Sequence, residues 1–287
     1  HQTNPVIVMK VLVIESNEAV ARLLQSTLEG DGEEVVAESS RSNLAAHLRD
    51  TFYDVIILDP SPLNEPQQLI VQLRKHASSN TYIFLFSDEH TRADAQNAGM
   101  NDVLGKPVDH DELREKMGQA RFMRKLSDHL TDESEDFPSA GGVISKSAFK
   151  QLFLSSLDRA GRYSENACII MIGLENFRDI LENDGPYAAE YAAAKLSQNL
   201  VRLRRQADII GQTDKHEYAL LLMAPPANKE PISAANRFAE SLSKCSDIYE
   251  GGAHQADIYV RAIFLPSGIC LRDHHFRIAA AEESRQA

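Results

Sequence analysis

The sequence predicts an α/β protein of two domains, of which the first is built on a parallel sheet. The chain has 287 residues, about twice the roughly 150 residues of a typical domain, so each half is long enough to bury its own core. In the first half, short apolar runs alternate five times with segments whose apolar residues recur at helical spacing. Such alternation is typical of β-α units, which assemble into a parallel sheet with helices on both faces.

The elements of the first half follow one another along residues 10–130. Each expected strand is a nearly continuous apolar run, as in strands that are buried on both faces of a sheet. The expected strands are residues 10–14, 34–37, 54–58, 82–86 and 102–104, and the expected helices are residues 19–28, 43–49, 67–75, 92–98 and 111–130.

Polar side chains stand just after four of these strands. They are Glu15 and Ser16 after the first strand, Asp59 after the third, Ser87 after the fourth and Lys106 after the fifth. The carboxyl ends of parallel strands meet at one edge of a sheet, where ligands bind. An Asp acceptor with a hydroxyl and an ammonium group as donors suits a phosphoryl group, and neighbouring carboxylates suit Mg²⁺. Taken singly, such residues are more often solvated loop residues.

The segments "VLVIESNEA", "DVIILDP", "FLFSD" and "AGMNDVLGKPV" resemble the receiver domain of two-component response regulators over residues 10–122, in order and in spacing. The resemblance implies a flavodoxin-like fold in which Asp59 is the phosphoacceptor. It also implies a sensor kinase or phosphotransfer protein as partner. Two positions depart from the family's pattern. The family has two acidic residues after the first strand, and here the second of them is Ser16. The family also has an aromatic residue three positions before the Lys, which moves inward on phosphorylation, and here it is Val103. We therefore expect Glu15 and Asp59 to bind Mg²⁺ weakly and Asp59 to be phosphorylated slowly or incompletely.

An acidic segment separates the two expected domains. Residues 131–136 are rich in Asp and Glu, and residues 137–142 contain the helix breakers Pro and Gly. The expected boundaries are residues 9–125 for the receiver domain, 126–142 for a helical extension with the acidic linker, and 143–287 for the second domain. An apolar stripe on the last helix of the first half suggests a homodimer or, alternatively, packing against the second domain; it consists of Leu113, Met117, Ala120 and Leu130.

The second half shows a different order of elements. The expected helices are residues 149–162, 188–204, 234–244 and a last one near 276–284. The expected strands are residues 167–172, 208–212, 217–222 and 258–264, with a tight connection at residues 213–216. This order, above all the hairpin "DIIGQTDKHEYALLL" after a long helix, resembles the GGDEF domain of diguanylate cyclases over about 140 residues. The resemblance implies an α+β, nucleotidyl-cyclase-like fold with a mainly antiparallel sheet.

The same resemblance implies that the cyclase site is degenerate. The signature is occupied by "DKHEY", which retains Glu217. Gly173 and His216 replace the two metal carboxylates, Asp214 and Lys215 replace the two glycines that approach phosphate, and Leu181 and Glu190 replace the guanine-binding Asn and Asp. Without the carboxylates the site is not expected to hold Mg²⁺ on a triphosphate, and the former glycines now carry side chains. We expect no cyclase activity.

One element of the cyclase family is retained. Arg205 and Asp208 have the Arg-x-x-Asp spacing and lie five residues before the signature, which is the register of the family's inhibitory site for cyclic di-GMP. A guanidinium can donate to phosphate or guanine, and a carboxylate can accept from the N1 and N2 hydrogens of guanine. Arg237, on the following helix, is the candidate for a second arginine that contacts the same ligand. Alternatively, Arg205 and Asp208 form an ordinary exposed ion pair.

Composition limits the classes of partner. The net charge of −12 disfavours nucleic acid. Three cysteines without a CxxC pair indicate neither a disulfide framework nor a thiolate zinc site, so a reducing cytoplasm is expected. No apolar run is long enough for a membrane span or signal peptide.

The two resemblances lead to two hypotheses about function. The first is an effector that binds cyclic di-GMP through a non-catalytic GGDEF-like domain, and the second is an interaction module that binds only proteins.

Overall fold

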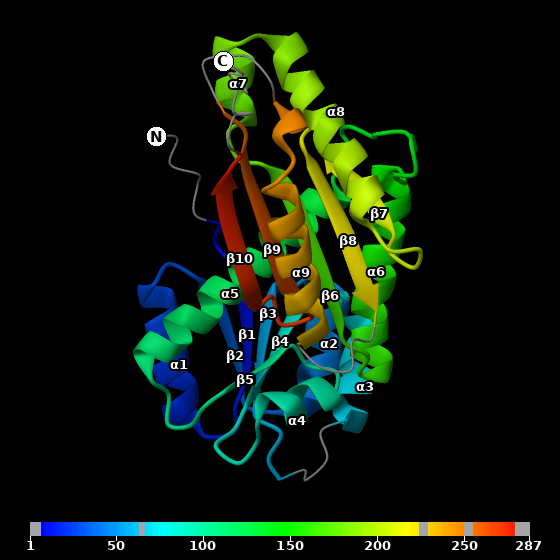
Figure 1. Cartoon of the computed structure of the whole chain (residues 1–287). Helices are drawn as coiled ribbons and strands as arrows, with labels where there is room; N and C mark the ends of the chain where they lie inside the picture. The colour runs from blue at the N-terminus through cyan, green and yellow to red at the C-terminus, as the bar shows by residue number, and fades with distance from the viewer. Residues whose placement is uncertain (1–6, 63–66, 224–228, 250–254, 279–287) are drawn as a thin grey trace, which may run out of the picture. The chain divides into compact units, whose positions relative to one another are not determined.

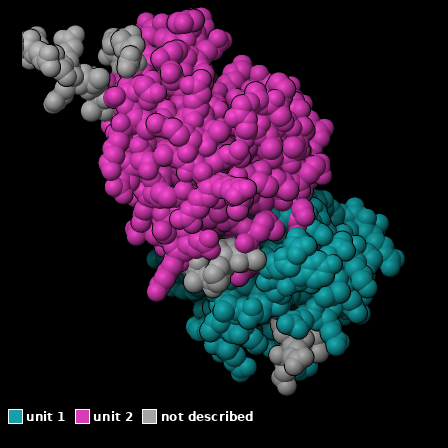
Figure 2. Space-filling view, turned by 45° about the vertical axis from the view of Figure 1, so that its right-hand side comes forward, with its two compact units in different colours: residues 1–129, 156–165, 265–268 teal, residues 130–155, 166–264, 269–287 magenta. Residues whose placement is uncertain are grey.

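The computed structural model describes residues 7–62, 67–223, 229–249 and 255–278. It divides into two compact units, which are coloured separately in Figure 2. The first unit comprises residues 1–129, 156–165 and 265–268, and the second comprises residues 130–155, 166–264 and 269–287. Among the described residues, no helix is both long enough and apolar enough to cross a membrane.

The first unit contains a five-stranded sheet in the order β2-β1-β3-β4-β5, and all its strand pairs are parallel. The strands are β1 (Lys10–Ile14), β2 (Glu34–Glu38), β3 (Val55–Leu58), β4 (Tyr82–Phe86) and β5 (Asp102–Leu104). The helices are α1 (Glu18–Gly30), α2 (Leu44–Asp50), α3 (Gln67–His76), α4 (Arg92–Asn97) and α5 (His110–Thr131) (Figure 1). The flavodoxin-like parallel fold predicted for this half is confirmed.

The strand order fixes where a site can form. The chain runs from β1 outward to β2 and then returns to β3 on the other side of β1, so β1 and β3 flank the point where the order reverses. Ligands of open α/β sheets bind at this point, beside the carboxyl ends of the strands. Every side chain of β3 and β4 is buried, which makes the frame beneath the site rigid.

The apolar stripe on α5 is not exposed. Leu113, Met117, Ala120 and Leu130 are all buried within the structure of the single chain. The stripe therefore offers no open apolar surface to a second copy, and the expected homodimer stays a prediction that this face does not support.

The second unit contains a five-stranded sheet in the order β10-β9-β6-β8-β7. Its strands are β6 (Ala167–Leu174), β7 (Ile210–Asp214), β8 (Glu217–Met223), β9 (Asp257–Leu265) and β10 (Cys270–Arg277). The pairs β6-β8, β7-β8 and β9-β10 are antiparallel. The helices are α6 (Lys146–Tyr163), of which residues 146–155 belong to this unit, α7 (Phe177–Asn183), α8 (Pro186–Leu203) and α9 (Lys229–Leu242). The predicted α+β fold is confirmed.

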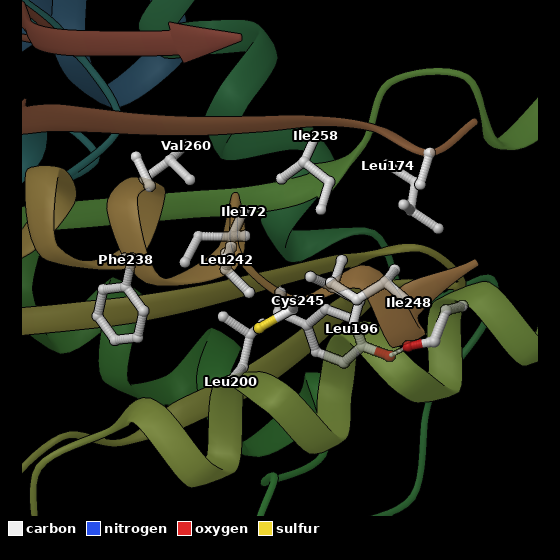
Figure 3. Packing of buried hydrophobic residues seen from close by; sticks show 14 of the residues in the cluster. Ile172, Leu174, Leu196, Leu200, Phe238, Leu242, Cys245, Ile248, Ile258 and Val260 are labelled. Atoms are coloured by element: carbon white, nitrogen blue, oxygen red, sulfur yellow. Dashed lines mark hydrogen bonds between the residues drawn. The ribbon is translucent and has the colours of Figure 1, made fainter. Parts of the chain in front are cut away.

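Helices α8 and α9 cover one face of this sheet. Alternate residues of the strands, such as Ile172 on β6 and Val260 on β9, pack against Leu196 and Leu200 of α8 and Phe238 of α9 (Figure 3). Because side chains alternate between the two faces of a strand, the neighbouring residues of β6, β8 and β9 point to the opposite face.

The prediction of a helix near residues 276–284 is wrong for residues 276 and 277, which belong to a strand. Residues up to Arg277 belong to β10, an edge strand that pairs with β9, and residues 279–284 lie outside the described part of the chain. The side chains of β10 are mostly exposed, so its sequence lacks the apolar alternation that marks a half-buried strand. Helix α7 was not predicted, and β7 begins at Ile210 rather than at Asp208.

Candidate functional site

Three of the residues predicted to form the receiver site meet at the carboxyl edge of the first sheet. The Nζ atom of Lys106 donates to Glu15 Oε2 at 2.7 Å and to Asp59 Oδ2 at 2.6 Å. Glu15 follows β1, Asp59 follows β3 and Lys106 follows β5, so the contact depends on the parallel strand order. A single ammonium group thus bridges two carboxylates that are 44 positions apart in the sequence.

The carboxylates of this site are buried. Glu15 is 2% exposed and Asp59 is 8% exposed. Burial raises the pKa of Asp59, but hydrogen bonds from Lys106 and from the backbone and side chain of Ser61 outweigh it, so the net pKa is lowered. Burial lowers the pKa of Lys106, and its hydrogen bonds to Asp59 and Glu15 reverse this and raise it. Asp59 is therefore held as an anion, the form in which it can act as a nucleophile.

Glu15 and Asp59 are the two carboxylates of this site that could hold Mg²⁺. Two carboxylates meet at one point, as a Mg²⁺ site with several bound waters requires. The second oxygen of each is already engaged, because the backbone N–H of Ser61 donates to Asp59 and that of Asn17 donates to Glu15, both at 2.8 Å. A cation would thus compete with the Lys106 ammonium group. Glu15 and Asp59 fit a weakly held Mg²⁺, and position 16 adds a hydroxyl instead of a third carboxylate.

Two cavities lie on either side of Asp59. One of about 400 Å³ is lined by Asp59, Ser16 and Arg41, and Ser16 is exposed within it. The other, of about 440 Å³, is lined by Asp59, Ser87, His90 and Lys106. The carboxylate is therefore accessible from two directions, although little of its surface is open.

Ser87 is present at the site but its hydroxyl is engaged. Its Oγ lies 2.8 Å from His90 Nδ1 and accepts from the backbone N–H of Glu89 at 3.1 Å. His90 and Arg41, whose Nη1 donates to the carbonyl oxygen of Pro60, were not identified from the sequence. His90 lies in a loop and Arg41 begins a short 3-10 helix, Arg41–Asn43; neither has a distinguishing spacing, so no pattern pointed to them.

We expect acetyl phosphate with Mg²⁺ to modify Asp59 slowly and incompletely, because Ser16 supplies no negative charge to the metal. The variant Ser16→Asp should react faster by on the order of tenfold, since it restores a carboxylate ligand. Intact-protein mass spectrometry over time measures both, with Asp59→Asn as the unreactive control. Rapid, stoichiometric modification of the parent protein would contradict this expectation.

In the second unit, three of the positions that the resemblance assigns to the cyclase site line one cavity of about 600 Å³. They are Leu181 on α7, Glu190 on α8 and Lys215 in the β7-β8 turn. His216, also in this turn, stacks on Phe177, with ring centroids 4.6 Å apart and an interplanar angle of 17°. A cavity thus lies at positions where the resemblance places a nucleotide.

Gly173 and Glu217 do not line this cavity; both lie against Tyr259, which was not predicted from the sequence. A Cβ atom at Gly173 would lie 2.4 Å from Tyr259 Oη. Tyr259 donates to Glu217 Oε2 at 2.5 Å, and Thr213 Oγ1 donates to Glu217 Oε1 at 2.7 Å. Burial, and then the adjacent Glu217 charge, raise the pKa of Tyr259 well above its usual value, which keeps this donor protonated. The phenol fills the space into which a side chain at position 173 would project.

Asp208 is the centre of the third predicted group. Its Oδ2 accepts from the backbone N–H of Arg205 at 2.8 Å and from Arg237 Nη2 at 3.3 Å. Asp208 is 9% exposed, whereas the Arg205 side chain is exposed. Within the described residues, Arg205 and Asp208 form no side-chain ion pair with each other, which contradicts the alternative of an ordinary ion pair. Arg237 instead holds the carboxylate, and the Arg205 guanidinium faces solvent.

Comparison with known proteins gives a family model and several relatives. Residues 11–118 match the model of the response regulator receiver domain. The CAI-1 autoinducer sensor kinase/phosphatase CqsS of Vibrio cholerae is 26% identical over 114 residues, which are 38% of this chain and 17% of that protein. The probable diguanylate cyclase DgcC of Escherichia coli is 24% identical over 102 residues, which are 36% of this chain and 27% of that protein. The chain thus spans less than a third of the length of these two relatives.

Among solved structures, the isolated GGDEF domain of TpbB (YfiN) from Pseudomonas aeruginosa is similar. It is 17% identical, with a TM-score of 0.34, over 42% of this chain and 70% of that domain. The family model and the parallel sheet identify a receiver domain in the first half of the chain. The diguanylate cyclase relative and the antiparallel sheet indicate a GGDEF-like domain in the second half. Residues 11–118 therefore belong to the response regulator receiver domain family, and a GGDEF-like domain follows them in the chain.

Proposed function

We propose that this chain is a two-component signalling protein whose GGDEF-like domain binds cyclic di-GMP and does not synthesise it. The observation that carries the binding half is the group formed by Arg205, Asp208 and Arg237. The carboxylate is oriented by Arg237 and by the backbone of Arg205, while the Arg205 guanidinium is left exposed. A ligand with phosphate and guanine groups would find a free donor beside a fixed acceptor.

The chemistry of this group matches cyclic di-GMP in two respects. An exposed guanidinium can donate in a fork to a phosphate or to the O6 and N7 atoms of guanine. The Asp208 carboxylate has one oxygen, Oδ2, in contact with Arg237 and the Arg205 backbone, so the other oxygen can accept from guanine N1 or N2. Adenine has no hydrogen at N1, so the pair favours guanine over adenine.

The proposed loss of synthesis has a steric basis as well as a chemical one. The resemblance places a metal carboxylate at position 173, where even a Cβ atom would clash with Tyr259 Oη. The retained Glu217 is occupied by hydrogen bonds from Tyr259 and Thr213. The position of the second metal carboxylate holds His216, which stacks on Phe177. Two GTP molecules would therefore lack the bound metal that their chemistry requires.

The receiver domain is proposed to connect this ligand to a phosphorylation signal. The buried, ionised Asp59 beside Lys106 supports phosphoacceptor chemistry, and a sensor kinase or phosphotransfer protein is the proposed partner. Ser87 is held by His90 and Val103 replaces the aromatic switch residue, so the proposed output depends more on the ligand than on the phosphoryl group.

Calorimetric titration of the full chain with cyclic di-GMP tests the proposal. We expect binding with a dissociation constant of roughly micromolar order, or about −8 kcal/mol. Cyclic di-AMP should bind at least about tenfold more weakly because it cannot donate from N1 to Asp208. No heat of binding at about a hundred micromolar ligand would favour the second hypothesis, an interaction module without nucleotide.

A further inference from the structure

We propose that the cavity between α7, α8 and the β7-β8 turn binds an uncharged, planar heteroaromatic molecule of two or three fused rings that carries no phosphate. The cavity has a volume of about 600 Å³, within the range of roughly 300 to 1,000 Å³ found for sites of small organic ligands. This inference goes beyond cyclic di-GMP binding, which uses Arg205, Asp208 and Arg237; none of these residues lines the cavity.

Aromatic rings supply the walls. Phe137, Phe177 and Tyr218 line the cavity, and they come from the segment before α6, from α7 and from β8. Phe177 is held by its stack with His216, and Tyr218 is held by a hydrogen bond from its hydroxyl to the carbonyl oxygen of Ala193 at 3.2 Å. Rings fixed in this way favour a flat ligand, because offset stacking and edge contacts need little further ordering.

Small residues of α8 create the space. Ala193 and Ala194 line the cavity, and Ala194 is exposed whereas Ala193 is buried. Glu190, Ala194 and Gln198 recur at four-residue spacing, so they lie on one face of the helix. The alanine between two longer polar residues leaves a recess into which a ring can enter.

Charge distinguishes the proposed ligand from a nucleotide. Lys215 is the cation of the lining and Glu190 is the carboxylate, so the two formal charges cancel. The Lys215 ammonium group also lies 3.5 Å from Glu135 Oε1, which reduces its attraction for an anion. A triphosphate would bring several negative charges to a site with no surplus cation.

The remaining lining groups are neutral. Ser197, Gln198 and Gln212 provide hydroxyl and amide groups, which can donate to or accept from the ring nitrogens and carbonyls of a heteroaromatic ligand. Leu181 also lines the cavity and is 40% exposed. A bound ring would cover this apolar side chain.

The probes are two matched pairs that differ in phosphate: riboflavin with flavin mononucleotide, and guanosine with GTP. Fluorescence titration of the full chain with riboflavin should give a dissociation constant of about tens of micromolar, a reasonable value for a ligand of this size. Guanosine should displace riboflavin. Flavin mononucleotide and GTP should each bind at least about tenfold more weakly than their partners without phosphate.

The variant Ala194→Trp should weaken riboflavin binding by at least about tenfold, because the indole fills the recess. Its matched control is Ala46→Trp, the same substitution at an exposed alanine of α2 in the first unit, which should bind riboflavin like the parent. If the parent binds cyclic di-GMP, Ala194→Trp should bind it equally well, which shows that the variant is folded. If the parent does not bind it, the far-ultraviolet circular dichroism spectrum shows whether the variant is folded.

Four results would overturn the inference. The first is failure of both riboflavin and guanosine to bind the parent protein. The second is binding of GTP as tight as that of guanosine. The third is unchanged riboflavin binding by Ala194→Trp. A dimer in light scattering that dissociates with Ala194→Trp would show that a second copy of the chain occupies the cavity, which would also contradict the proposal. None of these results depends on whether Arg205 binds cyclic di-GMP.

Discussion

The purified chain, supplied with GTP and Mg²⁺, is expected to form no cyclic di-GMP above a protein-free control. The proposed reason is that Gly173 and His216 stand where the resemblance places the two metal carboxylates, and that Asp214 and Lys215 carry side chains where it places bare backbone next to phosphate. Mass spectrometry of the reaction mixture measures this directly. Product above the control level would contradict the expectation.

Restoring the carboxylates should not restore activity. In Gly173→Asp with His216→Asp, the new Cβ at position 173 would meet Tyr259, which must then leave Glu217. We expect a loss of about 1 to 3 kcal/mol in the free energy of unfolding, as for other overpacked sites, and still no product.

A third substitution tests the steric explanation. Adding Tyr259→Ala to this variant removes the obstructing ring and should recover part of the lost stability. Urea denaturation of the three proteins provides the comparison. If the Gly173→Asp, His216→Asp protein were as stable as the parent, Tyr259 would not fill this position.

The second large effect concerns cyclic di-GMP. Arg205→Ala should weaken its binding by roughly ten- to a hundredfold, or about 1.5 to 3 kcal/mol, because it removes a charge-assisted contact. Asp208→Ala should also weaken binding and should reduce the discrimination against cyclic di-AMP, since the guanine acceptor is lost. Calorimetric titrations measure both effects.

A matched control for these variants is Arg178→Ala. Arg178 is an exposed arginine of α7 in the same unit, where it pairs with Glu182 one helical turn away. Its removal should leave the dissociation constant unchanged. If Arg205→Ala and Arg178→Ala bind as well as the parent, the proposed ligand site is wrong.

The sequence predicted the first unit more completely than the second, for a physical reason. Strands β3 and β4 are buried on both faces, so their continuous apolar runs stand out from the helices around them. Strand β10 is an edge strand without a buried side chain, and α7 has only seven residues, of which Ile180 is buried. Neither of these two leaves a clear periodicity in the sequence.

The sites show the same distinction. Glu15, Asp59 and Lys106 could be predicted to meet because each follows a strand of one parallel sheet. The contact of Tyr259 with Glu217 joins residues 42 positions apart, and that of Arg237 with Asp208 joins residues 29 positions apart. Both depend on the packing of separate elements of the second unit, which no local spacing records. The resemblance identified the altered positions but not the side chains that fill them.

The central claim, binding without synthesis, can be tested in one equilibrium dialysis. The full chain is dialysed against unlabelled cyclic di-GMP in the presence of ¹³C-labelled GTP and Mg²⁺, and the dinucleotide on both sides is analysed by mass spectrometry. The account predicts that unlabelled cyclic di-GMP accumulates on the protein side and that no ¹³C-labelled cyclic di-GMP forms. Equal concentrations of the dinucleotide on the two sides, or the appearance of labelled cyclic di-GMP, would contradict it.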